Sequence, residues 1–184
     1  MLIRKPKIAI LGGGSWATAI AKIFLTKEKS IYWYMRRDDR IADFIRLGHN
    51  PAYLTDVPFD TSRIRFSSDI NKVVDDAETL VLVTPSPYIK SHIQKLTADI
   101  SEKTIISAVK GIVPDENLSV SEYFIKKYNV PSKNILVVSG PSHAEEIALE
   151  RLSYLTLACS DKKKAELYAE KMANNYIRTS VSED

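Results

Sequence analysis

The sequence contains a single cysteine, Cys159, so the chain can form neither an internal disulfide nor a cysteine-based metal cluster. A chain of 184 residues buries about 70% of its unfolded surface on folding and needs no such crosslink. Cys159 lies in the run LSYLTLACS, where we expect a buried strand thiol, and the alternative is a reactive thiol. We expect no metal site in this chain.

Long apolar runs and an excess of one charge are also missing. No stretch approaches the roughly 18 apolar residues of a membrane span, and the basic N-terminus is followed by only a short apolar run before Gly12, unlike a signal peptide. The 26 basic and 23 acidic residues nearly balance, whereas nucleic-acid and membrane-surface proteins usually carry a concentrated basic face. We therefore expect a cytoplasmic protein without an integral membrane segment or a nucleic-acid partner.

Short apolar segments alternate with segments of helical periodicity. Several apolar segments are continuous, which is typical of strands buried on both faces. The expected strands are 7–12, 30–35, 79–84, 104–109, 134–139 and 153–159, and the expected helices are 17–27, 38–47, 87–100, 120–128 and 162–175. This order predicts an α/β fold, doubly wound, with a mainly parallel sheet and helices on both faces. We expect one domain over residues 1–184, in which the polar stretch 49–63 forms a long loop.

Glycine is scarce, and its placement is informative. Three of the six glycines, Gly12, Gly13 and Gly14, directly follow the first expected strand, and Gly111 and Gly140 follow two later strands. The special backbone positions therefore gather at the carboxyl ends of the strands, which is the edge where open parallel sheets bind ligands.

Residues 12–17 read G-x-G-x-x-A between a strand and an apolar helix. In this Rossmann-type fingerprint Gly12 permits the tight turn, Gly14 lets the backbone approach a pyrophosphate, and Ala17 lets the helix pack closely on the strand. The first N–H groups of the helix would face the phosphates. We predict a dinucleotide site here, and the alternative is a glycine-rich turn that binds nothing.

The second strand ends at two arginines, Arg36 and Arg37. An Asp or Glu that binds the adenosine ribose is expected near this position in NAD-specific proteins, whereas guanidinium groups suit the 2′-phosphate of NADP. A solvated loop whose charges are balanced by Asp38 and Asp39 is the alternative. We favour a cofactor role, with NADP or NAD as the cofactor.

Two further segments follow strands at the same edge. Lys110 directly follows the expected strand 104–109 and could bind a phosphate or a carbonyl, or be an ordinary loop lysine. Ser142 is a good N-cap, with Glu145 completing a capping box, and that helix start could also hold an anion. His143 has no partner that the sequence identifies, so we do not assign it a catalytic role.

Six segments in this order resemble the NAD(P)-dependent glycerol-3-phosphate dehydrogenases, especially the bacterial form. They are GGGSWATAIA (12–21), YMRR (34–37), HNPAYL (49–54), VTPS (83–86), AVKGI (108–112) and SGPSHAEEIA (139–148). The resemblance implies interconversion of glycerol 3-phosphate and dihydroxyacetone phosphate for phospholipid synthesis. The family's pattern is not matched everywhere, because Ala17 replaces the third glycine and Thr55-Asp56 replace a frequent Pro-Gly.

The resemblance also implies roles by position. The residues that would contact the cofactor are Gly12, Gly14, Ser15, Trp16, Arg36, Arg37, Tyr53 and Ala144. Lys110 would contact both the cofactor and the substrate. The substrate would also be contacted by Gly140 and Ser142.

Family members continue past the position of Asp184 into a helical domain, which carries the lysine acting as general base. Because that base would lie beyond Asp184, we expect this chain to be the cofactor domain alone, without a catalytic residue. Oligomers remain possible in the full-length enzyme. The alternatives are another two-domain hydroxy-acid dehydrogenase and a standalone dinucleotide-binding module.

Overall fold

The computed structural model describes residues 7–183. The basic start of the chain (1–6) lies outside the described residues, and so does Asp184, the position at which we expect the cofactor domain to end. The predicted boundaries of the domain, 1 and 184, are therefore not tested by the structure and stay predictions.

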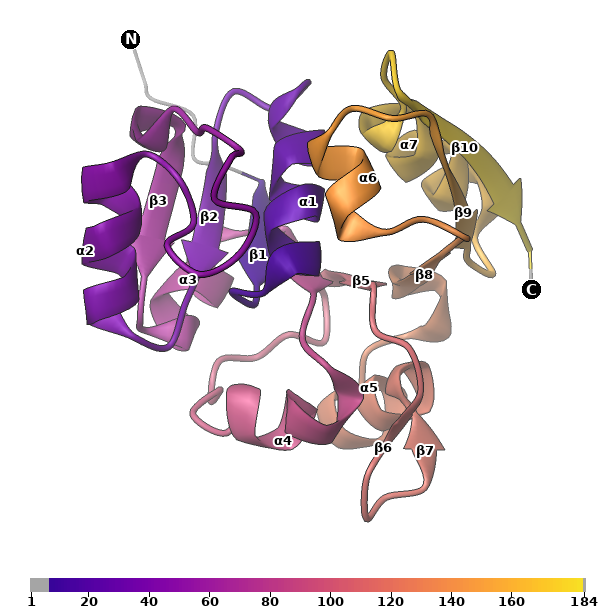
Figure 1. The fold of residues 1–184 in the computed structure, drawn as a ribbon. Helices are drawn as coiled ribbons and strands as arrows, with labels where there is room; N and C mark the ends of the chain where they lie inside the picture. The colour runs from indigo at the N-terminus through magenta and orange to yellow at the C-terminus, as the bar shows by residue number, and fades with distance from the viewer. Residues whose placement is uncertain (1–6, 184) are drawn as a thin grey trace, which may run out of the picture.

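One eight-stranded sheet runs through the molecule in the order β10-β9-β8-β5-β4-β1-β2-β3, and β6 and β7 form a separate short hairpin (Figure 1). The strands are β1 (Ile8–Leu11), β2 (Ile31–Tyr34), β3 (Ile64–Ser67), β4 (Thr79–Leu82), β5 (Thr104–Ser107), β6 (Ile112–Val113), β7 (Leu118–Ser119), β8 (Ile135–Ser139), β9 (Ser153–Ala158) and β10 (Ile177–Ser182). The helices are α1 (Ser15–Leu25), α2 (Asp38–Leu47), α3 (Ile70–Asp76), α4 (Ile89–His92), α5 (Val120–Tyr128), α6 (Ala144–Ala148) and α7 (Lys162–Met172).

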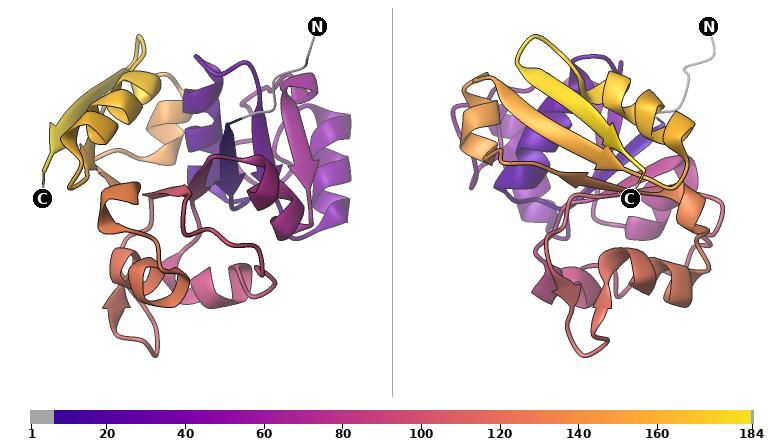
Figure 2. Two further views of the ribbon diagram at one scale, coloured as in Figure 1. Left: turned by 180° about the vertical axis from the view of Figure 1, so that it is seen from behind. Right: turned by 90° about the vertical axis from the view of Figure 1, so that its right-hand side faces the viewer.

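Both faces of the central strands are buried, which explains their continuous apolar runs. Ile8 and Ile10 of β1 face a core that also contains side chains of α1, α2, α6 and α7. Ala9 and Leu11 face a second core formed with α3, α4 and α5 on the other side of the sheet (Figures 1 and 2). The doubly wound fold and all six predicted strands are therefore confirmed.

The last two strands reverse direction. β9 pairs antiparallel with β8, and β10 pairs parallel with β9, while the other six strands are mutually parallel. A parallel crossover needs a helix long enough to return along the sheet, and α6 has only five residues, or about 8 Å of helix. The chain therefore begins β9 at the end of the sheet where β8 stops.

The predicted helix 87–100 is wrong beyond His92. A 3-10 turn (Ser86–Tyr88) and the short α4 are followed by irregular chain. The side chain of Asn71 on α3 explains the break: its amide nitrogen donates to the carbonyl of Lys95 at 2.8 Å, and its oxygen accepts from the backbone N–H groups of Thr97 and Ala98. Helical periodicity in the sequence yields here to a tertiary contact. The pattern also missed β3, α3 and the β6–β7 hairpin.

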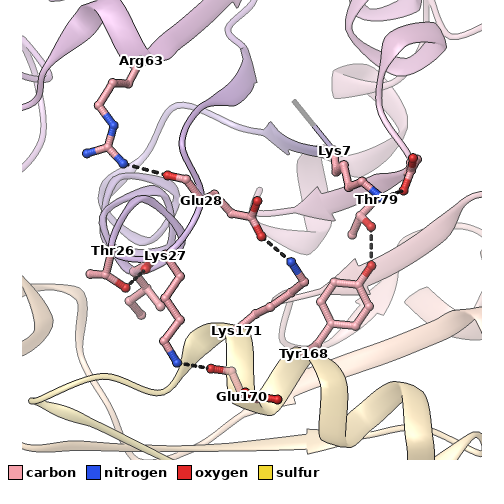
Figure 3. Close-up of polar contacts among 11 residues, drawn as sticks. Lys7, Thr26, Lys27, Glu28, Arg63, Thr79, Tyr168, Glu170 and Lys171 are labelled. Carbon is pink, nitrogen blue, oxygen red and sulfur yellow. Dashed lines mark hydrogen bonds and ion pairs between the residues drawn. The ribbon is translucent and has the colours of Figure 1, made fainter. Parts of the chain in front are cut away.

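Contacts at the amino ends of the strands attach α7 to the first half of the sheet (Figure 3). The hydroxyls of Tyr168 and Thr79 are hydrogen-bonded, and Lys171 forms an ion pair with Glu28, just after α1. Lys27 donates to the carbonyl of Glu170 at 2.5 Å. These contacts fix the reversed β9–α7–β10 segment to β4 and to the residues just after α1, which lie far from it in the sequence.

Among residues 7–183, no helix has the length and apolar character to cross a membrane.

Candidate functional site

A cavity of about 800 Å³ opens at the carboxyl ends of β1, β2, β4 and β5. The chain leaves β1 toward β2 on one side and β4 lies on the other, so the cavity occupies the point where the strand order reverses. It is lined by Gly13, Gly14, Ser15, Trp16, Ala17, Met35, Arg36, Arg37, Arg40, Asn50, Ala52, Tyr53, Val83, Thr84, Pro85, Ser86, Pro87, Tyr88, His92, Ala108, Val109 and Lys110. The structure thus brings seven predicted residues together: Gly14, Ser15, Trp16, Arg36, Arg37, Tyr53 and Lys110.

Gly12, which we predicted to contact the cofactor, is not among the residues that line this cavity, but its surroundings require a glycine. Its φ is +148°, and a Cβ atom built on it would lie 2.1 Å from the carbonyl oxygen of Val83. The buried indole of Trp33 donates to the Gly12 carbonyl at 2.6 Å, and Trp33 itself packs against Phe44, Phe59 and Phe66. The aromatic cluster therefore fixes the first half of the glycine turn.

Gly14 has the opposite surroundings. A Cβ on Gly14 would meet no atom within 4 Å, so the backbone here faces open space beside the cavity. Gly14 caps α1 without a side chain, and the first turn of α1 contains no acidic residue. The free N–H groups of the helix start can therefore approach an anion, and the described residues fit a pyrophosphate at this turn.

The charges around the cavity all have one sign. Arg36, Arg37, Arg40 and Lys110 line it, and no Asp or Glu does so among the described residues. This asymmetry contrasts with the balanced charge of the whole chain. Low-dielectric walls lined by one sign of charge attract the opposite charge, so the cavity favours an anionic ligand.

The two arginines predicted as a pair differ in their contacts. Arg37 donates from Nε to Asp39 at 2.9 Å and forms a second, shorter contact with the same carboxylate, which raises the pKa of Arg37 and lowers that of Asp39. Arg36, in the described part of the chain, makes no hydrogen bond or ion pair. Of the two arginines predicted as a pair, Arg36 is therefore the one whose guanidinium is free for a ligand.

His92 is a cavity residue that the sequence did not single out. It is 6% exposed, and burial, followed by the nearby charge of Arg36, lowers its pKa to about 4. Its Nε2 atom has no hydrogen-bond partner within residues 7–183. A neutral imidazole thus lies beside the free arginine, and only the fold brings it there from the end of α4.

The segment after β8 lies outside the cavity lining. Gly140 has a φ of +150°, and a Cβ there would lie 2.3 Å from the carbonyl oxygen of Tyr154. The predicted capping role of Ser142 is wrong, because α6 begins one residue later and His143 is its N-cap. The Ser142 hydroxyl donates to the Tyr154 carbonyl at 2.9 Å and accepts from the Tyr154 N–H at 3.2 Å. Ala144 opens α6 and is buried.

With this geometry established, comparison with known proteins gives a consistent result. The family model described as the N-terminus of NAD-dependent glycerol-3-phosphate dehydrogenase matches residues 7–165. The chain belongs to this glycerol-3-phosphate dehydrogenase family. The fingerprint at residues 12–17 and the cavity beside it therefore lie within the part of the chain that matches this N-terminal family model.

Individual relatives agree. The chain is 34% identical over 182 residues to a glycerol-3-phosphate dehydrogenase [NAD(P)+] of Listeria innocua, covering 97% of this chain and 53% of that protein. It is 32% identical to the Bacillus subtilis protein of the same description, with 97% and 52% coverage. A solved glycerol-3-phosphate dehydrogenase of Plasmodium falciparum is 27% identical, with a TM-score of 0.85 over 98% of this chain and 53% of that one. The chain thus spans about half the length of the relatives it matches.

Proposed function

We propose that the cavity binds NADP(H) or NAD(H). The observation that carries this proposal is the combination of an open helix N-terminus at Gly14 with four cationic side chains and no carboxylate in the described lining. A dinucleotide carries its charge on the pyrophosphate, and NADP adds a 2′-phosphate, so both parts of this lining have a partner.

The proposed contacts follow the geometry. The backbone at Gly14, Ser15 and Trp16 holds the pyrophosphate, Arg36 holds the adenosine end, and Tyr53, which is 48% exposed, covers the cavity from the 49–63 loop. Arg37 can join Arg36 only after it gives up Asp39. Lys110 lines the cavity just after β5, and we propose that it contacts both cofactor and substrate, as the family resemblance implies.

The other three residues named by the resemblance need a different description. Gly140 and Ser142 are proposed substrate contacts and Ala144 a proposed cofactor contact, but the Ser142 hydroxyl is already bonded twice to Tyr154. We infer that Ser142 shapes the turn and that any contact from this segment uses its backbone.

We propose that the chain supplies the cofactor part of an enzyme that interconverts glycerol 3-phosphate and dihydroxyacetone phosphate. The bound nicotinamide would supply hydride transfer, and this chain's residues would bind and orient it. The family resemblance assigns the general base to a helical domain beyond Asp184. It also supports a cytoplasmic role in glycerophospholipid synthesis with a small phosphorylated substrate.

Calorimetric titration of the 184-residue chain with NADPH and with NADH tests the proposal. We expect saturable binding of both with one site per chain. Wild-type protein that is folded by circular dichroism and binds neither cofactor would overturn it.

A further inference from the structure

Asn50 is a buried polar residue within the loop that covers residues 49–63. It is 1% exposed, and its side chain uses its full hydrogen-bonding capacity. Nδ2 donates to the Gly13 carbonyl at 3.1 Å and to the Thr18 hydroxyl at 2.8 Å. Oδ1 accepts from the backbone N–H groups of Ala52 at 3.0 Å and Tyr53 at 3.2 Å.

These four partners belong to two segments that are far apart in the sequence. Gly13 lies in the glycine turn, and Thr18, in the first turn of α1, donates onward to the Gly14 carbonyl at 2.9 Å. Ala52 and Tyr53 line the same cavity from the 49–63 loop. One amide therefore joins the phosphate-facing turn to the segment that carries Tyr53.

Only a side chain with donors and acceptors on one planar group fits this position. The carbonyl of Gly13 can only accept, and the two loop N–H groups can only donate, so the orientation of the amide is fixed by its partners. The loop has other attachments, because the Phe59 N–H donates to the Gly48 carbonyl at 2.8 Å and Phe59 packs on Trp33. Loss of the amide should thus leave the loop attached but change its position relative to the glycine turn.

We propose that Asn50 is a positioning residue of the dinucleotide site, holding the glycine turn and the Tyr53 segment in the arrangement that the cofactor requires. This inference rests on the proposed function of the cavity. Asn50 borders the cavity, but its amide is fully used by Gly13, Thr18, Ala52 and Tyr53, so its proposed role is to position these groups.

Asn71 provides a matched control for this role. Its amide also joins two segments, from α3 to residues 95–98, with one donation to a carbonyl and two acceptances from backbone N–H groups. It is not among the residues that line the cavity. Asn50→Leu and Asn71→Leu therefore each remove the hydrogen bonds of one uncharged amide that joins two segments. Neither substitution adds a charge that could repel a phosphate.

The test measures NADPH dissociation constants by calorimetry, together with melting temperatures, for wild type and both variants. We expect Asn50→Leu to weaken NADPH binding by about ten-fold or more, the equivalent of one or two lost hydrogen bonds, and Asn71→Leu to leave binding unchanged. Thr18→Val, which removes one of the two donations from Asn50, should weaken binding by roughly three-fold on the same reasoning. Unchanged affinity in a folded Asn50→Leu protein would overturn the positioning role while leaving the proposed function intact.

A double-mutant cycle separates positioning from general stability. If Asn50 acts through the Tyr53 segment, Tyr53→Ala costs less NADPH affinity in the Asn50→Leu background than in wild type. Additive losses, or losses in both Asn variants that follow their melting temperatures, would show a purely structural amide and overturn the proposal. Should Asn50→Leu fail to fold, Thr18→Val and Tyr53→Ala form the same cycle. A wild-type protein that does not bind NADPH would overturn this inference and the proposed function together.

Discussion

Arg37 and Asp39 are paired through two contacts between one guanidinium and one carboxylate, both on the exposed start of α2. Of these two neighbouring arginines, Arg36 is the one without a hydrogen bond or ion pair in the described residues. Two arginines that are equivalent in the sequence are therefore unequal in the structure.

Because Arg37 is paired with Asp39, we predict that Arg36 is the arginine that binds the 2′-phosphate of NADPH. Arg36→Ala should weaken NADPH binding by about ten-fold or more, because a charge-assisted contact is lost, and should weaken NADH binding much less. Arg37→Ala should have a smaller effect on NADPH, and Asp39→Asn should tighten NADPH by releasing Arg37. Calorimetry with both cofactors measures these differences, and equal losses for NADPH and NADH in Arg36→Ala would refute the 2′-phosphate role.

The glycine turn predicts opposite outcomes at two neighbouring positions. Gly14→Val places a side chain in open space where the pyrophosphate would approach, so cofactor binding should vanish while the melting temperature changes little. Gly12→Ala forces a Cβ against the Val83 carbonyl at a strained φ, so it should destabilise the fold strongly. Thermal denaturation and NADPH titration of both variants check the contrast, and normal NADPH affinity in Gly14→Val would mean that the cofactor binds elsewhere.

His92 predicts a pH dependence of stability. Its pKa is about 4 in the folded chain and about 6.5 when unfolded, so the unfolded state binds the proton more readily. The stability associated with the neutral imidazole is complete above pH 6.5 and is lost as the pH falls from 6.5 toward 4, by about 2 kcal/mol between pH 7 and pH 5. Urea denaturation at these two pH values should show a smaller difference in His92→Gln than in wild type. An identical pH dependence in the two proteins would contradict the buried neutral state.

Turnover provides a further prediction. Hydride transfer needs the substrate held against the nicotinamide and a general base on its hydroxyl, and such a base typically contributes about 10²–10⁴-fold to the rate. Because the family resemblance assigns that base to residues beyond Asp184, the 184-residue chain should bind NADPH without oxidising it in the presence of dihydroxyacetone phosphate. The absorbance of reduced nicotinamide follows the reaction, with a longer relative such as the Bacillus subtilis enzyme as the positive control. Rapid oxidation by this chain would show that its active site is complete.

Much of the fold could be predicted from the sequence because the composition of a segment reflects how deeply that segment is buried. The run from Ile8 to Leu11 is apolar throughout because both faces of β1 are buried, so its composition records its environment directly. Gly12 and Gly14 mark the turn after β1. The surroundings of Gly12 exclude a side chain, and the backbone at Gly14 faces open space. The cavity residues at the ends of β1, β2 and β5 were found for the same reason, since each follows a recognisable strand.

Other features were decided by contacts between distant segments. Helical periodicity over 87–100 gave way to the amide of Asn71. The short α6 left β9 antiparallel to β8, and the alternating burial of β9 shows that one of its faces is only partly covered. Contacts between distant segments also decide the details of the site. They bury His92 and give Asn50 its four hydrogen bonds, whereas Arg36 is left without a hydrogen bond or ion pair. Each of these outcomes depends on which groups the fold brings within about 3 Å of one another. Periodicity and composition report how deeply each position is buried. They do not report which polar groups form hydrogen bonds with each other. A hydrogen bond depends on the positions of both partners, and the position of a partner far along the chain is set only by the tertiary structure.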